Sequence, residues 1–123
     1  MEIEMTTLPK TWILDLDGTI VKHNGYKLDG MDSLLPGARD FLCQIKEEDM
    51  VIFVTSRKKE HQENTENFLR KEGIRFDHII YEAPYGERIL VNDSKPSKRI
   101  MAYAFTPNRD EACKVKITEN EAL

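Results

Sequence analysis

The sequence lacks the features that mark secreted, disulfide-bonded or membrane-spanning chains. Only two of its 123 residues are cysteine, Cys43 and Cys113, and they show neither a CxxC nor a Cys/His spacing, which argues against a disulfide framework or structural zinc. No apolar run approaches the roughly 20 residues that cross a bilayer. The polar start, Met1 to Lys10, does not resemble a secretory signal. We therefore expect a cytoplasmic protein with no membrane partner.

The sequence also lacks an excess of positive charge. Its 18 Lys and Arg against 22 Asp and Glu give a net charge of −4, so we expect no general nucleic-acid binding, although a nucleotide stays open as a small substrate. With 40% hydrophobic and 33% charged residues, the composition is typical of a globular chain. The length predicts one domain over residues 1–123.

Short apolar runs alternate with amphipathic segments, which predicts an α/β fold with a mainly parallel, five-stranded central sheet. The expected strands are Trp12–Leu16, Val51–Val54, Ile79–Tyr81, Ile89–Val91 and Ile100–Phe105. We expect the first to be buried on both faces. One helix should follow Pro36, with Ala38, Phe41, Leu42 and Ile45 on its inner face, and another should cover 59–72 and end at Gly73. For residues 20–35, the polar, glycine-bearing composition predicts an irregular flap or a small hairpin.

Three strand ends carry polar side chains, which gather at one edge of a parallel sheet. The strongest signal is Asp15-Leu16-Asp17-Gly18-Thr19, because residues two apart in an extended chain point to the same side. Two close carboxylates suit Mg²⁺, which prefers oxygen ligands. One of them can attack phosphorus, while the other protonates the leaving oxygen and then activates water.

The segment Asp15–Thr19 resembles the first motif of the haloacid dehalogenase superfamily of phosphohydrolases. Leu35-Pro36-Gly37-Ala38 leads into a helix as in that family, Val54-Thr55-Ser56-Arg57 resembles its second motif, and Val91-Asn92-Asp93 resembles its fourth. The segments occur in the family's order and span most of the chain. The resemblance implies a three-layer, Rossmann-like domain. Because too few residues separate the motifs for a cap domain, the chain is similar to the capless subclass.

Residue by residue, the resemblance implies that Asp15 is the nucleophile and Asp17 the general acid and base. Gly18 and Thr19 would shape the phosphate loop, and Thr55 would donate a hydrogen bond to the phosphate of the substrate. Ser56 and Arg57 beside it are further candidates for substrate binding, with pairing to a nearby acid as the structural alternative for Arg57. The implied Mg²⁺ ligands are Asp15, Asp17 through its main chain, and Asp93. Thr55 as a helix cap and Asp93 as a turn former are the structural alternatives.

Two positions depart from the family pattern. Asn92 stands where many members have a second acid, and no Lys lies between Lys71 and Lys95, where the third motif supplies one. We prefer Lys95 over Lys58 as the substitute catalytic ammonium. A missing preorganised charge typically lowers the rate about 10²–10³-fold.

The sequence therefore predicts Mg²⁺-dependent hydrolysis of a phosphate monoester, with a small sugar phosphate favoured by analogy and nucleotides and phosphoproteins open. Members without a cap act on large exposed phosphates or close the site with a neighbouring subunit, so a homo-oligomer is a reasonable hypothesis. The alternative function is that of a phosphate-binding or regulatory module with weak catalytic activity, which lacks the third-motif Lys. A purely structural use of the fold would leave Asp15 and Asp17 without a purpose.

Overall fold

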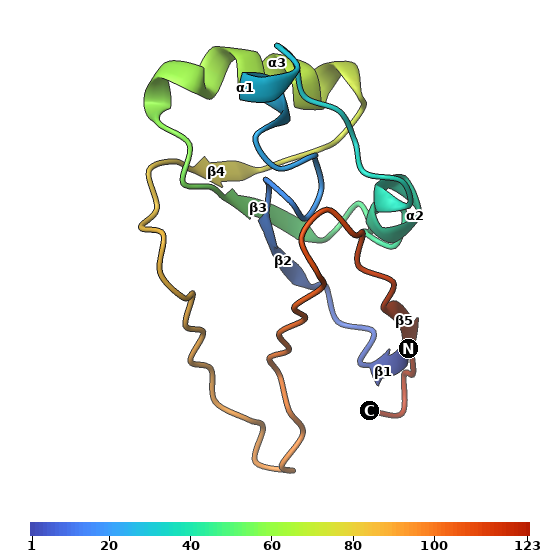
Figure 1. The fold of residues 1–123 in the computed structure, drawn as a ribbon. Helices are drawn as coiled ribbons and strands as arrows, with labels where there is room; N and C mark the ends of the chain where they lie inside the picture. The colour runs from blue at the N-terminus through green and yellow to red at the C-terminus, as the bar shows by residue number, and fades with distance from the viewer.

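The computed structural model describes residues 1–123 and has an α/β fold in which all paired strands are parallel (Figure 1). Its strands are β1 (Glu2–Met5), β2 (Thr11–Asp15), β3 (Met50–Val54), β4 (His78–Ile80) and β5 (Lys116–Glu119). Its helices are α1 (Gly25–Leu28), α2 (Ala38–Leu42), the 3-10 turn η1 (Lys59–His61) and α3 (Gln62–Lys71). None of these helices is both long and apolar enough to span a bilayer.

The central sheet has the order β2-β3-β4, and its buried face forms the core. Trp12 and Leu14 of β2 pair with Val51 and Phe53 of β3, and all four side chains point into the core. Leu69 of α3 completes the same cluster. This burial is what holds β2 and β3, and therefore the ends of both strands, in a fixed relative position.

The other face of this sheet is open, so the prediction that the first strand is buried on both faces is wrong. Ile13 of β2 and Ile80 of β4 are each 53% exposed. The packed helices contact the core face: Phe41 of α2 meets Trp12 edge-on at 5.8 Å between ring centroids, and Leu69 of α3 is fully buried. Side chains alternate across a strand, so helices on one face leave the other face less covered: on the central strand β3, Ile52 and Val54 are half-buried.

The predicted helices are present, the first shorter than expected. α2 ends at Leu42 because the chain then turns, with Ile45 N–H donating to Leu42 O and Asp49 N–H to Lys46 O. Phe41, Leu42 and Ile45 nevertheless pack against the core as predicted. The second helix, formed by η1 and α3, ends before Gly73, whose φ of +70° suits glycine.

The predicted flap, residues 20–35, is largely irregular and contains the single-turn helix α1. Its two arms are joined where Lys22 N–H donates to Ser33 O and Leu35 N–H donates to Ile20 O, each at 3.0 Å. Ile20 and Val21, the first two residues of the flap, are buried in the core. The flap is therefore anchored at its base.

A second sheet pairs the two ends of the chain and was not predicted. Glu2–Met5 aligns in parallel with Lys116–Glu119. Gln44 holds this sheet to α2: its Nε2 donates to Val115 O at 2.9 Å, and Ile117 N–H donates to its Oε1 at 2.7 Å. The pairing escaped prediction because both strands are short, polar and more than 100 residues apart.

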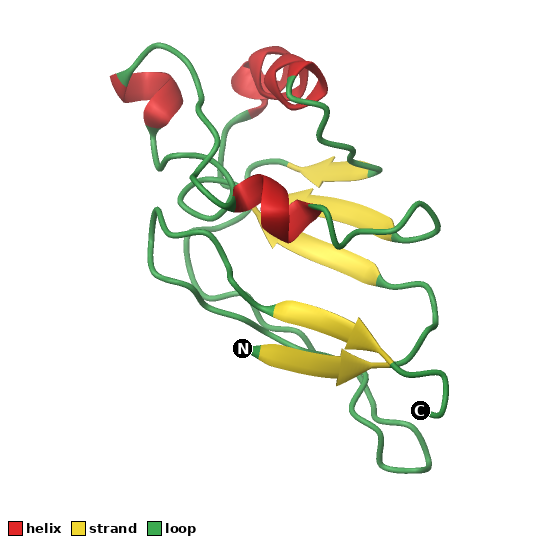
Figure 2. Cartoon of the chain, turned by 90° about the vertical axis from the view of Figure 1, so that its right-hand side faces the viewer, coloured by secondary structure: helices red, strands yellow, loops and turns green.

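Residues 82–115 form no helix or strand, so the expected strands at Ile89–Val91 and Ile100–Phe105 are absent. The segment runs out from β4 as a long extended loop and returns toward α2 (Figure 1). Ile89 and Val91 are 87% and 89% exposed. A mainly parallel arrangement is thus confirmed, but the strands form two separate sheets, of three and two strands (Figure 2), instead of a single sheet of five.

Candidate functional site

The carboxyl end of β2 opens into a tight loop that carries both aspartates of the motif. Asp15 is the last residue of the strand, and Gly18 turns the chain with a φ of +80°. The N–H of Gly18 donates to Val21 O at 2.7 Å. A side chain at position 18 would also meet Arg109 Cγ at 3.1 Å, so the loop requires glycine.

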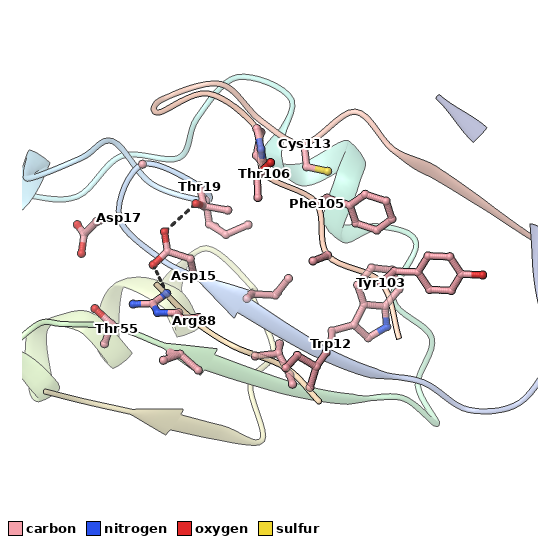
Figure 3. A pocket seen from close by; sticks show the side chains of 18 of the residues that line it. Trp12, Asp15, Asp17, Thr19, Thr55, Arg88, Tyr103, Phe105, Thr106 and Cys113 are labelled. Carbon is pink, nitrogen blue, oxygen red and sulfur yellow. Dashed lines mark hydrogen bonds and ion pairs between the residues drawn. The ribbon is translucent and has the colours of Figure 1, made fainter. Parts of the chain in front are cut away.

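Asp15 receives hydrogen bonds from two directions. Thr19 Oγ1 donates to Asp15 Oδ2 at 2.8 Å, and Arg88 Nη1 donates to Asp15 Oδ1 at 2.8 Å (Figure 3). The Asp15 side chain is 39% exposed. The Asp15 carboxyl group is therefore oriented by two donors and still open to a ligand, as a nucleophile must be.

Asp17 is held instead by a buried arginine. Arg57 Nε donates to Asp17 Oδ2 at 3.0 Å and Arg57 Nη2 to Asp17 Oδ1 at 2.9 Å. The same guanidinium donates to Asp32 of the flap, from Nη1 at 2.9 Å and from Nη2 at 2.7 Å. Figure 3 shows the Asp17 carboxylate apart from that of Asp15. The two aspartates thus have different surroundings although they are two residues apart.

Arg57 is 2% exposed at its side chain, and its charge is compensated from several sides. Nη1 also donates to Thr65 Oγ1 of α3 at 2.9 Å, and the Tyr26 ring lies 4.0 Å from the guanidinium carbon. Burial alone would lower the pKa of Arg57, but the hydrogen bonds to Asp32 and Asp17 outweigh it and raise that pKa above its ordinary value. Arg57 is therefore a permanently charged centre of the site.

The end of β3 brings Thr55, Ser56 and Arg57 beside the aspartates, because β2 and β3 are adjacent and parallel. Asp15 aligns with Val54, so Thr55 follows directly. Thr55 is 1% exposed, and its Oγ1 accepts a hydrogen bond from Arg57 N–H at 3.1 Å. Thr55 and Ser56 line the cavity described next. The geometry also agrees with Thr55 organising its own turn.

A cavity of about 1520 Å³ lies between the strand ends and the extended segment 82–115. Asp15, Asp17 and Arg88 line one part of it, while Tyr103 and Phe105 line another (Figure 3). The Tyr103 and Phe105 rings are parallel within 7°, with centroids 6.3 Å apart. Lys58 and Arg109 also line it. The volume of the cavity is much larger than that of a phosphate ion.

Two of the predicted site residues do not line this cavity. Asp93 and Lys95 lie in the projecting part of segment 82–115, outside the cavity lining, and Lys95 N–H bonds locally to Arg99 O. Asp93 is exposed. Their catalytic and metal-binding roles stay predictions of the sequence.

As arranged, the carboxylates do not form a Mg²⁺ site. The oxygens of Asp15 face Arg88 and Thr19, and those of Asp17 face Arg57. No group of three or more His, Cys, Asp or Glu side chains is placed to hold a metal ion. Arginines supply the positive charge in this arrangement.

Two residues of the site were missed by sequence reasoning. Arg88 contacts Asp15 across 73 positions of sequence, where a Lys was sought. The available signal was that Arg75 and Arg88 are the only arginines between Lys71 and Lys95, so an arginine had to be considered as the cation. Asp32 carried no signal, because one acid in a polar flap is usually solvated.

No protein-family model and no curated protein matches the chain. Two solved chains are similar to it. One, from the structure of the Pnkp1/Rnl/Hen1 complex, is 31% identical with a TM-score of 0.52, and the match covers 69% of this chain and 32% of that one. The other, from the structure of the Pnkp1/Rnl/Hen1 RNA repair complex, is 30% identical with a TM-score of 0.52, covering 70% and 30%. This chain thus spans about a third of either relative.

Proposed function

We propose that the protein hydrolyses phosphate monoesters through an aspartyl-phosphate on Asp15. The observation that carries the proposal is the state of Asp15: a partly exposed carboxylate at the end of β2, oriented by Thr19 and Arg88 and facing a large cavity. A guanidinium at this position would neutralise negative charge as an oxygen of Asp15 meets a phosphate. Arg88 thereby takes the role sought for a third-motif Lys.

The proposed reaction has two displacements at phosphorus. In the first, an Asp15 oxygen bonds to phosphorus, the bond from phosphorus to the leaving oxygen breaks, and that oxygen takes a proton from the Asp17 carboxyl. In the second, Asp17 takes a proton from water, the water oxygen bonds to phosphorus, and the Asp15–phosphate bond breaks to release inorganic phosphate. Asp17 must leave Arg57 to act in either step.

The finer assignment, to the capless haloacid dehalogenase-like phosphatases, is part of this proposal, although this chain has sheets of three and two strands in place of a single central sheet of five. Its support is the motif order, the parallel β2-β3-β4 sheet and the position of Asp15. A requirement for Mg²⁺ and a cytoplasmic location are retained from the sequence. Mg²⁺ supplies charge neutralisation at the phosphate in that family, and no step above depends on it.

The first candidate substrate is a small sugar phosphate, favoured by analogy. A second class, the phosphate of a nucleotide or an RNA end, is favoured by two observations. The similar solved chains belong to a complex described as an RNA repair complex. The cavity also carries the parallel rings of Tyr103 and Phe105 together with Arg109, a combination that suits base stacking beside phosphate.

Phosphate release from a panel of sugar phosphates, nucleotides, 3′- and 5′-phosphorylated oligoribonucleotides and an aryl phosphate tests the proposal, with and without Mg²⁺. We expect turnover in the parent chain and a loss of at least about 10⁴-fold in Asp15→Asn, which keeps the shape of the side chain but cannot form the acyl phosphate. Asp29→Asn is the matched control, since Asp29 pairs with Lys22 on the exposed surface of the flap.

Turnover that survives in Asp15→Asn contradicts the mechanism. Phosphate binding without turnover in the parent chain favours the alternative function, a phosphate-binding or regulatory module. A gel-filtration mass above that of one chain would support the homo-oligomer expected for a site without a cap.

A further inference from the structure

One guanidinium in this site serves two carboxylates, although a single carboxylate would balance its charge. Arg57 donates to both oxygens of Asp17 and to both oxygens of Asp32. The side chains of Arg57 and Asp32 are 2% and 6% exposed, whereas that of Asp17 is 17% exposed. Asp17 is therefore the more accessible of the two partners, and it is the one that lines the cavity.

A buried guanidinium that loses its only partner is costly, because the uncompensated charge remains out of water. If Asp17 were the sole partner of Arg57, each movement of Asp17 toward the substrate would leave such a charge. Asp32 removes this penalty, since its bidentate pair with Arg57 persists when Asp17 departs. Thr65 and the Tyr26 ring hold the guanidinium in place meanwhile.

We propose that Asp32 is a positioning residue, which keeps Arg57 paired and in place so that Asp17 can turn to the leaving oxygen of the substrate. This inference rests on the proposed function. It also gives the flap a role in the reaction, because Asp32 lies in residues 20–35 and ties them to the end of β3.

The test exploits the leaving group. A 4-nitrophenolate departs without a proton, whereas an alkoxide, as from a sugar phosphate, needs the general acid. A residue that acts through Asp17 must therefore matter more for the alkyl ester than for the aryl ester. A residue that only stabilises the fold affects both esters equally.

Asp32→Asn keeps the shape of the side chain and removes its charge. For it we expect kcat to fall about tenfold or more on the alkyl phosphate and within about twofold on 4-nitrophenyl phosphate, with KM little changed. Asp32→Glu, which restores the charge, should recover part of the alkyl rate. Asp17→Asn should give the same leaving-group signature more strongly, and Asp29→Asn, in the same flap, should leave both rates unchanged.

Arg57→Lys provides a second route if Asp32→Asn does not fold, since one ammonium cannot donate in pairs to two carboxylates. It should show the same selective loss on the alkyl ester. Equal losses on both esters in Asp32→Asn or Arg57→Lys, or no loss in Asp32→Asn, would overturn the inference while leaving the proposed function intact. Absence of turnover in the parent chain overturns both together.

Discussion

Two regions of this molecule meet at the candidate site, and they are held in different ways. Residues 11–81 contain the core, the β2-β3-β4 sheet and the buried Arg57 cluster. Residues 82–115 contain no helix or strand, and no side chain beyond Ile74 is buried. This segment contacts the site through a few hydrogen bonds. Arg88 donates to Asp15. The backbone N–H of Asp110 donates to Gly18 O, and the Asp110 carboxylate accepts from the backbone N–H of His23.

The difference shows that the first region supplies the fold and the buried ion pairs, whereas the second supplies the cation that pairs with Asp15. An ion pair as exposed as that of Arg88 and Asp15, at 41% and 39%, adds little to stability. In the proposed mechanism, the same pair changes the charge at Asp15, where a preorganised cation has a large effect on rate. Substitutions in the core of the first region should therefore lower stability, whereas substitution of Arg88 in the second region should lower activity with little effect on stability.

The largest expected effect is in the core. Phe53→Ala should destabilise the protein by about 3–5 kcal/mol, because Phe53 is fully buried and its removal leaves a cavity. Val91→Ala, at an 89% exposed position, should change stability by less than about 0.5 kcal/mol. Urea unfolding measures the free energy of unfolding of both variants. Equal losses of stability in the two variants would contradict this difference between the regions.

Arg88→Ala should lower kcat/KM by about 10²–10³-fold while leaving the unfolding midpoint near that of the parent chain, since the pair with Asp15 is exposed. Arg88→Lys, which keeps the charge, should recover part of the rate. Steady-state kinetics and thermal unfolding on the same preparations check both statements. A parallel fall in stability would mean that segment 82–115 is part of the folding unit.

Asp49 offers a test by pH in the first region. Burial disfavours its ionised form, but hydrogen bonds from Lys10 N–H, the Trp12 indole and Lys46 N–H outweigh that cost and lower the pKa of Asp49 below 3.8. A group whose pKa is lower in the folded state stabilises the protein above its unfolded pKa, and this contribution disappears as pH falls through the folded pKa.

Asp49→Asn should therefore cost about 2 kcal/mol at pH 6, and the difference from the parent chain should shrink toward pH 3. Denaturant unfolding at the two pH values measures it. Asp93→Asn, at an exposed position of the second region, is the matched control and should show no such convergence. If the loss of stability in Asp49→Asn were the same at both pH values, it would come from the changed shape of the side chain and not from its charge.

The smallest expected effect is that of Lys95→Ala. Because Lys95 is not among the residues that line the cavity, loss of its charge should leave kcat/KM within about twofold of the parent value. A loss like that of Arg88→Ala would mean that the projecting segment folds back during turnover and that Lys95 serves as the sequence predicts.

Much of the secondary structure of the first region could be predicted from the sequence. The β2 and β3 runs, the inner faces of α2 and α3, and the break at Gly73 follow from local periodicity and one glycine. The polar ends at Asp15, Asp17 and Thr55 followed from the parallel sheet. The same reasoning wrongly predicted strands at the apolar runs 89–91 and 100–105, because an apolar run forms a strand only where a neighbouring strand edge pairs with it.

Residue types and their spacing by themselves determined the α/β class, the paired aspartates and the glycine turn, because each depends on contacts within a few positions. Tertiary structure alone decided which cation meets which carboxylate: Arg88 at Asp15, and Arg57 between Asp17 and Asp32. Those pairs join residues 25 to 73 positions apart. Coulomb attraction has no sequence periodicity, so only the folded arrangement selects among the available charges.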